Sequence, residues 1–328
     1  MTFASLSFLY YFLPVVVGVS CLLPRGKTNA ARNWFLLVAS LFFCLWTHGA
    51  MFSLPFVAVF GMQAAAYLVG LLRKQFRPRK DPLYLALYLL GTPWAVGPML
   101  PYPVLEQQLR ERTCTVPKFA AGLRRLIWGL CQTVILADTL RAFTQAVDTF
   151  GEVSVVLGWA KLVGMVLAVY YTLSGHANMA VGLGRLLGFE LCGLASGFLL
   201  WVETLSQTWK TKLERHRTLC LGCIWILLLL GGVICSTGGG QSAAALLTPL
   251  FGGGTTERLG PGGAYLLRSY AIPFGLALLF ATPWPARWIE RLRRGKHTAR
   301  LFAVLEPVAL ALLLLLGTAW LVDGGASF

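Results

Sequence analysis

The chain has 328 residues, of which 57% are hydrophobic and only 12% are charged, and its formal net charge is +15. Soluble domains average about 45–50% apolar and about 25% charged residues. A soluble fold of this length has no room to bury so much apolar surface. The composition therefore excludes an ordinary soluble protein and predicts a chain that crosses a lipid bilayer several times.

The apolar residues fall in blocks whose lengths approach the roughly 20 residues that a helix needs to cross the hydrocarbon core. In chain order the blocks lie at residues 3–23, 34–46, 51–72, 84–100, 126–140, 153–173, 189–203, 219–235, 264–282 and 301–322. Some are too short or too rich in glycine to cross alone, notably 34–46, 84–100 and 189–203. The first block lacks a signal-peptide cleavage pattern, so it is expected to remain as a permanent span.

These blocks predict an all-α, polytopic membrane protein with about eight to ten hydrophobic segments, at least one of them re-entrant. No hydrophilic stretch is long enough to form a separate soluble domain, and no clear internal repeat is visible. The simplest organisation is one membrane domain over residues 1–328. The eight cysteines predict no metal site, because the CxxC pair of Cys220 and Cys223 lacks a second pair or a nearby His cluster.

Most of the 28 Lys and Arg residues fall in five clusters between the apolar blocks. The clusters lie within residues 25–32, 73–80, 110–125, 210–217 and 287–300. The positive-inside rule places them on the cytoplasmic side, which predicts a multi-pass protein of the cell membrane with both termini outside. Orientation and attraction to anionic headgroups account for the positive charge. Membrane lipids are therefore the expected partners, and nucleic acid is not.

Residues 116–125 are predicted to form an interfacial helix on the cytoplasmic surface. Pro117 fits the first turn of such a helix, and Lys and Arg side chains along it can reach lipid headgroups. Phe119, Leu123 and Leu126 recur at helical spacing.

Short motifs follow one another in a fixed order along the first 190 residues. They include SLSFLYYFLP at 5–14, LLPR at 22–25, VGP at 96–98, GLRR at 122–125, LAD at 136–138 and YYTLSGHANMAVGLG at 170–184. In order and spacing they resemble the membrane-bound O-acyltransferase family, in particular its bacterial branch that O-acetylates alginate and related polysaccharides. Residues 1–190 resemble the N-terminal part of the family domain, and residues 191–328 resemble its C-terminal part more thinly.

The resemblance implies a chemistry but also a missing motif. In this family a membrane-embedded His within a Trp-His-Gly motif acts as the base that deprotonates an acceptor hydroxyl, which then attacks an activated acyl group such as a thioester. No Trp-His-Gly motif occurs in this chain. Residues 193–201 resemble the family's sequence around the catalytic site with that motif removed, so the catalytic middle of the family domain is expected to be absent.

Four histidines are present, and His176 is the candidate catalytic residue. His48, His216 and His297 are expected to be solvated or to face headgroups. His176 takes the place of the family's Tyr beside an expected break in the helix, and an ionisable residue inside a membrane is a functional hypothesis by default. The structural alternative is an imidazole that donates to a backbone carbonyl.

Further residues are expected to line a substrate tunnel or a re-entrant segment. They are Gly97, Pro98, Ser174, Gly175 and Asn178. Asn178 replaces the family's Asp, which removes a carboxylate that might have oriented a base. The spacing of Gly182, Gly184 and Gly188 indicates close helix packing rather than a dinucleotide-binding loop.

The leading interpretation is a membrane O-acyltransferase-like protein. The family function is transfer of an acyl group, such as acetyl, to hydroxyls of a cell-surface polysaccharide, and loss of the catalytic His is expected to impair it here. No bound cofactor is expected, and the acyl donor would be a thioester or similar compound. The resemblance also implies a polysaccharide or cell-wall acceptor and a secreted partner acyltransferase.

Two alternatives remain open at this point. The first is a pseudoenzyme, that is, a non-catalytic partner or decayed paralogue. The second is a transporter or channel. The second alternative is disfavoured, because acidic residues in the middle of spans are few and no repeat is visible.

Overall fold

The computed structural model describes residues 5–23, 29–48, 54–74, 76, 82–91, 102–149, 154–189, 261–281 and 296–324. These residues are almost entirely helical and include no strand. Three helices are long and apolar enough to cross a membrane: Val116–Thr149, Val155–Leu186 and Leu305–Val322. A bent pair, Gly262–Ser269 with Ala271–Ala281, gives a fourth if it counts as one span. The predicted class, an all-α polytopic membrane protein, is confirmed.

The chain divides into two compact units. Unit 1 consists of Met1–Leu130, His176–Ser206 and Leu321–Phe328, and unit 2 consists of Cys131–Gly175 and Gln207–Trp320. Each unit draws on segments that are distant in the sequence.

Unit 1 begins with a π-helical turn, η1 (Phe8–Phe12), that continues directly into α1 (Leu13–Leu22). Aromatic rings join this first helix to α2 (Ala30–His48), with ring centroids 5.3 Å apart for Phe8 and Phe43 and 5.2 Å apart for Phe12 and Phe43. Such pairs bury large apolar areas in favourable edge or tilted geometries. The predicted block 34–46, too short to cross a bilayer alone, is thus part of a helix that packs on its neighbour.

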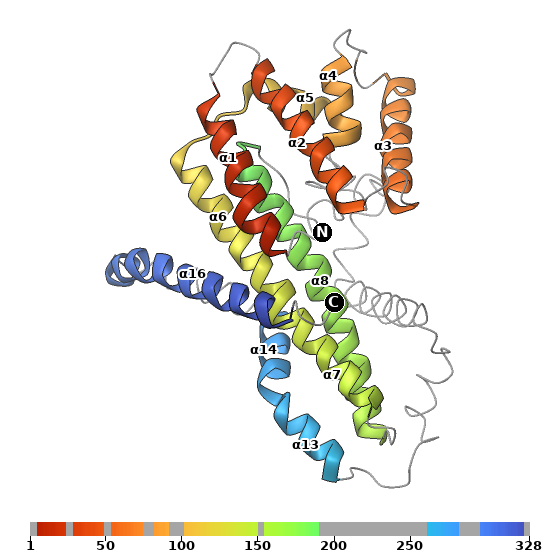
Figure 1. Cartoon of the computed structure of the whole chain (residues 1–328), viewed down its shortest axis with the longest axis vertical. Helices are drawn as coiled ribbons and strands as arrows, with labels where there is room; N and C mark the ends of the chain where they lie inside the picture. Colours follow the sequence, from red (N-terminus) through yellow and green to blue (C-terminus); the bar gives the residue numbers. More distant parts are fainter. Residues whose placement is uncertain are drawn as a thin grey trace, which may run out of the picture. The chain divides into compact units, whose positions relative to one another are not determined.

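Four further elements of unit 1 gather around a cluster of tyrosines. They are α3 (Leu54–Leu72), α4 (Pro82–Ala86), η2 (Leu87–Gly91) and α5 (Tyr102–Glu111), and Figure 1 shows them in orange and yellow. Tyr102 is the centre, with its ring 5.0 Å from Tyr67 and 5.6 Å from Tyr88. Most of the predicted segment 84–100 lies outside the described residues.

The interfacial helix predicted for residues 116–125 begins as expected but does not end there. α6 (Val116–Cys131) runs on through η3 (Gln132–Ala137) into α7 (Asp138–Thr149), and together they form one helical run of 34 residues. The change from basic to apolar side chains near Arg125 is not a helix stop signal, because no Pro, and no capping Gly, follows it. The prediction of a separate helix that ends at 125 was wrong.

α8 (Val155–Leu186) is also longer than the predicted block 153–173. Its backbone stays helical through Ser174 and Gly175, so the expected break beside His176 does not occur. A single Gly costs a helix only about 1 kcal/mol relative to Ala, and the apolar residues on either side continue the helix.

The core of unit 2 lies between α7, the first part of α8, and two C-terminal helices, α13 (Pro261–Ser269) and α14 (Ala271–Ala281). Phe143 of α7 is fully buried, and its ring lies edge-on to Phe274 with centroids 5.5 Å apart. The bend between α13 and α14 is 51°, and Pro273 explains it because proline cannot donate the helical hydrogen bond and crowds the preceding turn.

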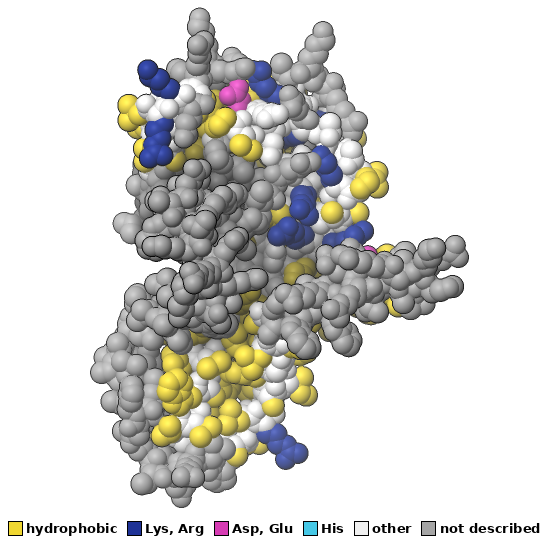
Figure 2. Space-filling model, turned by 180° about the vertical axis from the view of Figure 1, so that it is seen from behind, with side chains coloured by type: hydrophobic (Ala, Val, Ile, Leu, Met, Phe, Trp, Pro, Cys, Tyr) yellow, Lys and Arg dark blue, Asp and Glu magenta, His cyan; other side chains and the backbone are white. Residues whose placement is uncertain are grey.

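The last helix is α16 (Lys296–Gly324), and Pro307 lies within it. Figure 2 shows many hydrophobic side chains of the described residues gathered together at the surface. Lipid-facing apolar surface of this kind is ordinary in a membrane helix bundle, because lipid tails are as apolar as the side chains that they meet.

Candidate functional site

The helices α6 and α8 approach each other in unit 1 through glycine. A Cβ added to Gly182 would lie 2.6 Å from the backbone nitrogen of Leu126 and 2.8 Å from the carbonyl oxygen of Gly122. A Cβ added to Gly122 would lie 2.9 Å from the carbonyl oxygen of Gly182. Only glycine fits at this contact, which is how small residues allow membrane helices to meet backbone to backbone. The close packing predicted for Gly182 is confirmed.

One turn before this contact, Asn178 of α8 meets Arg125 of α6. The Arg125 Nε donates a hydrogen bond to the Asn178 Oδ1 over 3.1 Å. The sequence suggested an Arg125 side chain that reaches toward headgroups, and this contact was not foreseen. In the sequence, the one indication of this contact was that both residues lie in motifs that resemble the membrane-bound O-acyltransferases.

His176 does not share a helix face with Asn178. Residues two apart on an α-helix are separated by about 200° around its axis, so the two side chains leave α8 on opposite sides. His176 is half-buried. The Asn178 amide is therefore not placed to hydrogen-bond to the His176 imidazole and orient it as a catalytic base.

The remaining predicted site residues lie either on α8 or outside the described residues. Ser174 lies one helical turn before Asn178 on the same side of α8, and Gly175 follows it, whereas Gly97 and Pro98 lie outside the described residues. Residues 193–201 also lie outside them. Of the four histidines, His176 is the one whose side chain the structure describes. The described residues hold no group of three or more His, Cys, Asp or Glu side chains able to bind a metal ion.

Gly188 does not take part in helix packing as predicted. Its φ is +88°, and it ends α8 in a Schellman motif. The Gly188 N–H donates to the Arg185 carbonyl over 3.1 Å, and the Phe189 N–H donates to the Gly184 carbonyl over 2.8 Å. This pattern needs a left-handed residue just beyond the helix, which glycine adopts without strain.

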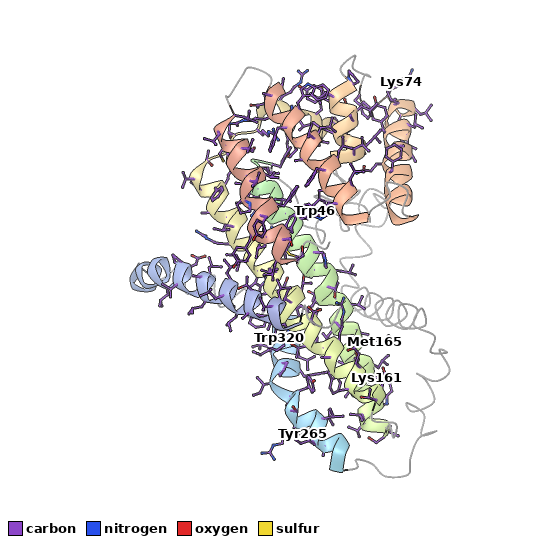
Figure 3. The ribbon with its side chains drawn as sticks, in the orientation of Figure 1. Trp46, Lys74, Lys161, Met165, Tyr265 and Trp320 are labelled. Atoms are coloured by element: carbon purple, nitrogen blue, oxygen red, sulfur yellow. The ribbon has the colours of Figure 1, made fainter. Side chains whose placement is uncertain are left out.

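Charged side chains of α7 form two ion pairs in unit 2, one within α7 and one with α8. Arg141 donates to the Asp138 Oδ1 over 2.9 Å and to the Thr172 Oγ1 over 2.8 Å. Lys161, labelled in Figure 3, pairs with Asp148. Pairing lowers the cost of charge within or near a membrane. Asp138 of the LAD motif thus pairs, within α7, with the arginine that bridges to α8.

The sequence comparisons bear on the identity of these motifs. Three curated proteins named probable alginate O-acetylase AlgI are each 24% identical to this chain: over 216 residues in Pseudomonas aeruginosa, 199 in Pseudomonas fluorescens and 135 in Azotobacter vinelandii. The chain is related to the alginate O-acetylases. The predicted resemblance to this branch of the membrane-bound O-acyltransferases is thereby confirmed.

The relationship is partial in extent. The match to the Pseudomonas aeruginosa protein covers 58% of this chain and 41% of that protein, and the match to the Pseudomonas fluorescens protein covers 57% and 39%. The chain therefore spans about two fifths of the length of these alginate O-acetylases. No family model matches the chain, and no solved structure matches it.

Proposed function

We propose that this chain is an alginate O-acetylase-like membrane protein that takes part in O-acetylation of a cell-surface polysaccharide without performing the acyl transfer itself. The similarity to alginate O-acetylases carries the first part of the proposal. At the level of the family, this similarity supports a membrane acyltransferase-like function.

The second part rests on what the catalytic step demands. A base must take the proton from the acceptor hydroxyl as its oxygen attacks the acyl carbonyl, and the thiol then leaves with a proton. The chain contains no Trp-His-Gly motif. His176, the candidate substitute, lies on the opposite side of α8 from Asn178, and Asn178 accepts a hydrogen bond from Arg125.

The proposal includes a setting for the protein. The chain would be a multi-pass protein of the cell membrane with both termini outside, in contact with membrane lipids, and would work beside a polysaccharide or cell-wall acceptor and a secreted partner acyltransferase. The acyl donor would be a thioester or similar compound, and no nucleic acid would be bound. Ser174, Gly175 and Asn178, with Gly97 and Pro98, would line the route of a substrate.

An assay with purified full chain tests the proposal. The protein is given a radiolabelled acetyl thioester and a soluble alginate acceptor, and label in the polymer is measured. We expect no transfer above the level of a protein-free control, and the same result for His176→Ala. Robust transfer by the wild-type chain that is abolished in His176→Ala would overturn the proposal and make His176 the base.

A further inference from the structure

Two arginines of unit 1 are buried where the ends of several helices meet. Arg32 is 5% exposed and lies in the first turn of α2, and Arg112 is 7% exposed and lies between α5 and α6. The C-terminal end of α8 is close by, because the Arg112 guanidinium lies over the Phe189 ring at 5.0 Å. Buried arginines are rare unless they are paired with an acidic group. The burial of these two arginines therefore needs an explanation.

The surrounding backbone holds the two arginines in place. Asn29 and Asn33, on either side of Arg32, donate side-chain hydrogen bonds to the carbonyls of Arg110 over 2.8 Å and Leu109 over 3.4 Å. These bonds fasten the start of α2 to the end of α5. Arg32 itself donates from Nε and Nη2 to the Leu23 carbonyl over 3.2 and 2.8 Å. Specific hydrogen bonds therefore fix the position of Arg32 and its neighbours, unlike those of mobile side chains at the surface.

Two nitrogens of the Arg112 guanidinium lack a hydrogen-bond acceptor in the part of the chain that the structure describes. Both terminal nitrogens, Nη1 and Nη2, are buried, and neither has a partner among the residues that the structure describes. Three carbonyls at the end of α8 already have donors, because the N–H groups of Phe189 and Gly188 bind those of Gly184 and Arg185, and the Cys114 Sγ lies 3.5 Å from that of Leu186. Arg112 therefore does not serve to cap α8.

Among the side chains of unit 1 that the structure describes, no carboxylate forms an ion pair with Arg32 or Arg112. Glu106 lies 3.7 Å from the Arg110 Nε and pairs with that third arginine. Burial and the nearby charge of Arg32 lower the pKa of Arg112 to about 10, so the guanidinium still carries its charge at neutral pH. A buried cation without a partner is costly, and an anion that binds there removes the cost.

We propose that Arg32 and Arg112 form a binding site for the oxyanion of a phosphate group, supplied by a lipid headgroup or by a soluble phosphate compound. Guanidinium forks match the geometry of phosphate oxygens, and two of them suit a tetrahedral group that offers oxygens in several directions. The site lies at the ends of α6 and α8, whose apolar runs are of spanning length. The ends of spanning helices lie at the depth of the headgroups. The proposal is independent of acyl transfer.

Thermal unfolding of the full chain in a neutral detergent tests the proposal. The Tm is followed with inorganic phosphate against chloride at equal ionic strength, and with micelles containing phosphatidylglycerol against micelles containing a phosphate-free diacyl glycolipid. We expect the Tm to rise and saturate with at least one phosphate probe. A response to inorganic phosphate indicates a site open to soluble compounds, and a response confined to phosphatidylglycerol indicates a headgroup site.

Substitutions identify the residues responsible. Arg112→Met keeps an apolar stem over Phe189 and removes the cation, and we expect it to abolish the rise in Tm. Arg32→Met is expected to weaken the rise and serves if the first variant does not fold. Arg73 is exposed and belongs to the same unit, so Arg73→Met is the matched control for general attraction to basic surfaces and should respond as the wild type does.

Native mass spectrometry gives a second readout that does not depend on cooperative melting. Wild-type protein extracted with phosphatidylglycerol should retain one more lipid molecule than Arg112→Met. The proposal is wrong if neither phosphate probe raises the wild-type Tm and no lipid is retained, or if Arg112→Met keeps the wild-type response.

Discussion

α8 packs against its neighbours in two different ways, one in each unit. In unit 1 the contact with α6 is made by backbone atoms at Gly122 and Gly182. In unit 2 the contact with α7 and α14 is made by side chains, including Phe143, Tyr171 and the Arg141 bridge to Thr172. The first contact depends on the absence of side chains, and the second depends on their presence.

The difference implies different tolerance to substitution. Backbone atoms cannot move aside without displacing a whole helix, so a glycine contact accepts no added atom. Side chains can change rotamer or leave a cavity, and the loss is then limited to the contacts of one residue. We therefore expect steep effects at the glycine contact of unit 1 and moderate effects in the core of unit 2.

The largest effect is expected for Gly182→Leu. A Cβ at this position would lie 2.6 Å from the Leu126 nitrogen, so α6 and α8 would have to separate, with a loss of about 3 kcal/mol in the free energy of unfolding. Thermal unfolding in detergent measures the change. The matched control is Gly61→Ala in α3, where an added Cβ meets nothing within 4 Å and the better helix propensity of Ala should leave the Tm unchanged or raised. Equal Tm values for the two variants would refute the glycine contact.

A moderate effect is expected for Tyr171→Phe in unit 2. The Tyr171 hydroxyl is buried and donates to the carbonyl of Ala277. Its removal leaves that carbonyl without this donor and should cost about 1–2 kcal/mol. Tyr265 is 74% exposed, so Tyr265→Phe is the control and should melt with the wild type. If Tyr171→Phe also melts with the wild type, the hydroxyl does not hold α14 to α8.

The smallest effect is expected at the Arg125 and Asn178 pair of unit 1. Asn178→Leu removes the acceptor of the Arg125 hydrogen bond and should lower the free energy of unfolding by about 1 kcal/mol. Asn178→Asp keeps an acceptor and adds a charge opposite to that of Arg125, so its Tm should match or exceed that of the wild type. A lower Tm for Asn178→Asp than for Asn178→Leu would show that the pair does not form.

Much of the fold follows from local sequence, because apolar blocks and small residues act within a few turns. The blocks predicted α2, α3, α8 and α16, and the glycine spacing predicted the contact at Gly182. Helix ends were harder, since no stop signal marks residues 125 or 174 and the helices simply continue. Gly188 was mistaken for a packing residue because a cap and a packing site both favour glycine.

Pairing between distant residues was not predictable from one sequence. Arg125 and Asn178 are 53 residues apart, and helical periodicity gives the face of a residue but not the partner of that face. Arg112 belongs to a basic cluster expected to face headgroups, yet it is buried. Composition identified the charge of that cluster and could not tell its buried member from the exposed ones.

The most direct test of the proposed function is the acetyl content of alginate made by cells that lack their own alginate O-acetylase. This chain, its His176→Ala variant and a full-length alginate O-acetylase are expressed separately, and each protein is detected in the membrane fraction before acetyl groups in the polymer are measured. We predict that the full-length enzyme restores acetylation and that this chain, with or without His176, does not. Restored acetylation by the wild-type chain that is lost in His176→Ala would contradict the account.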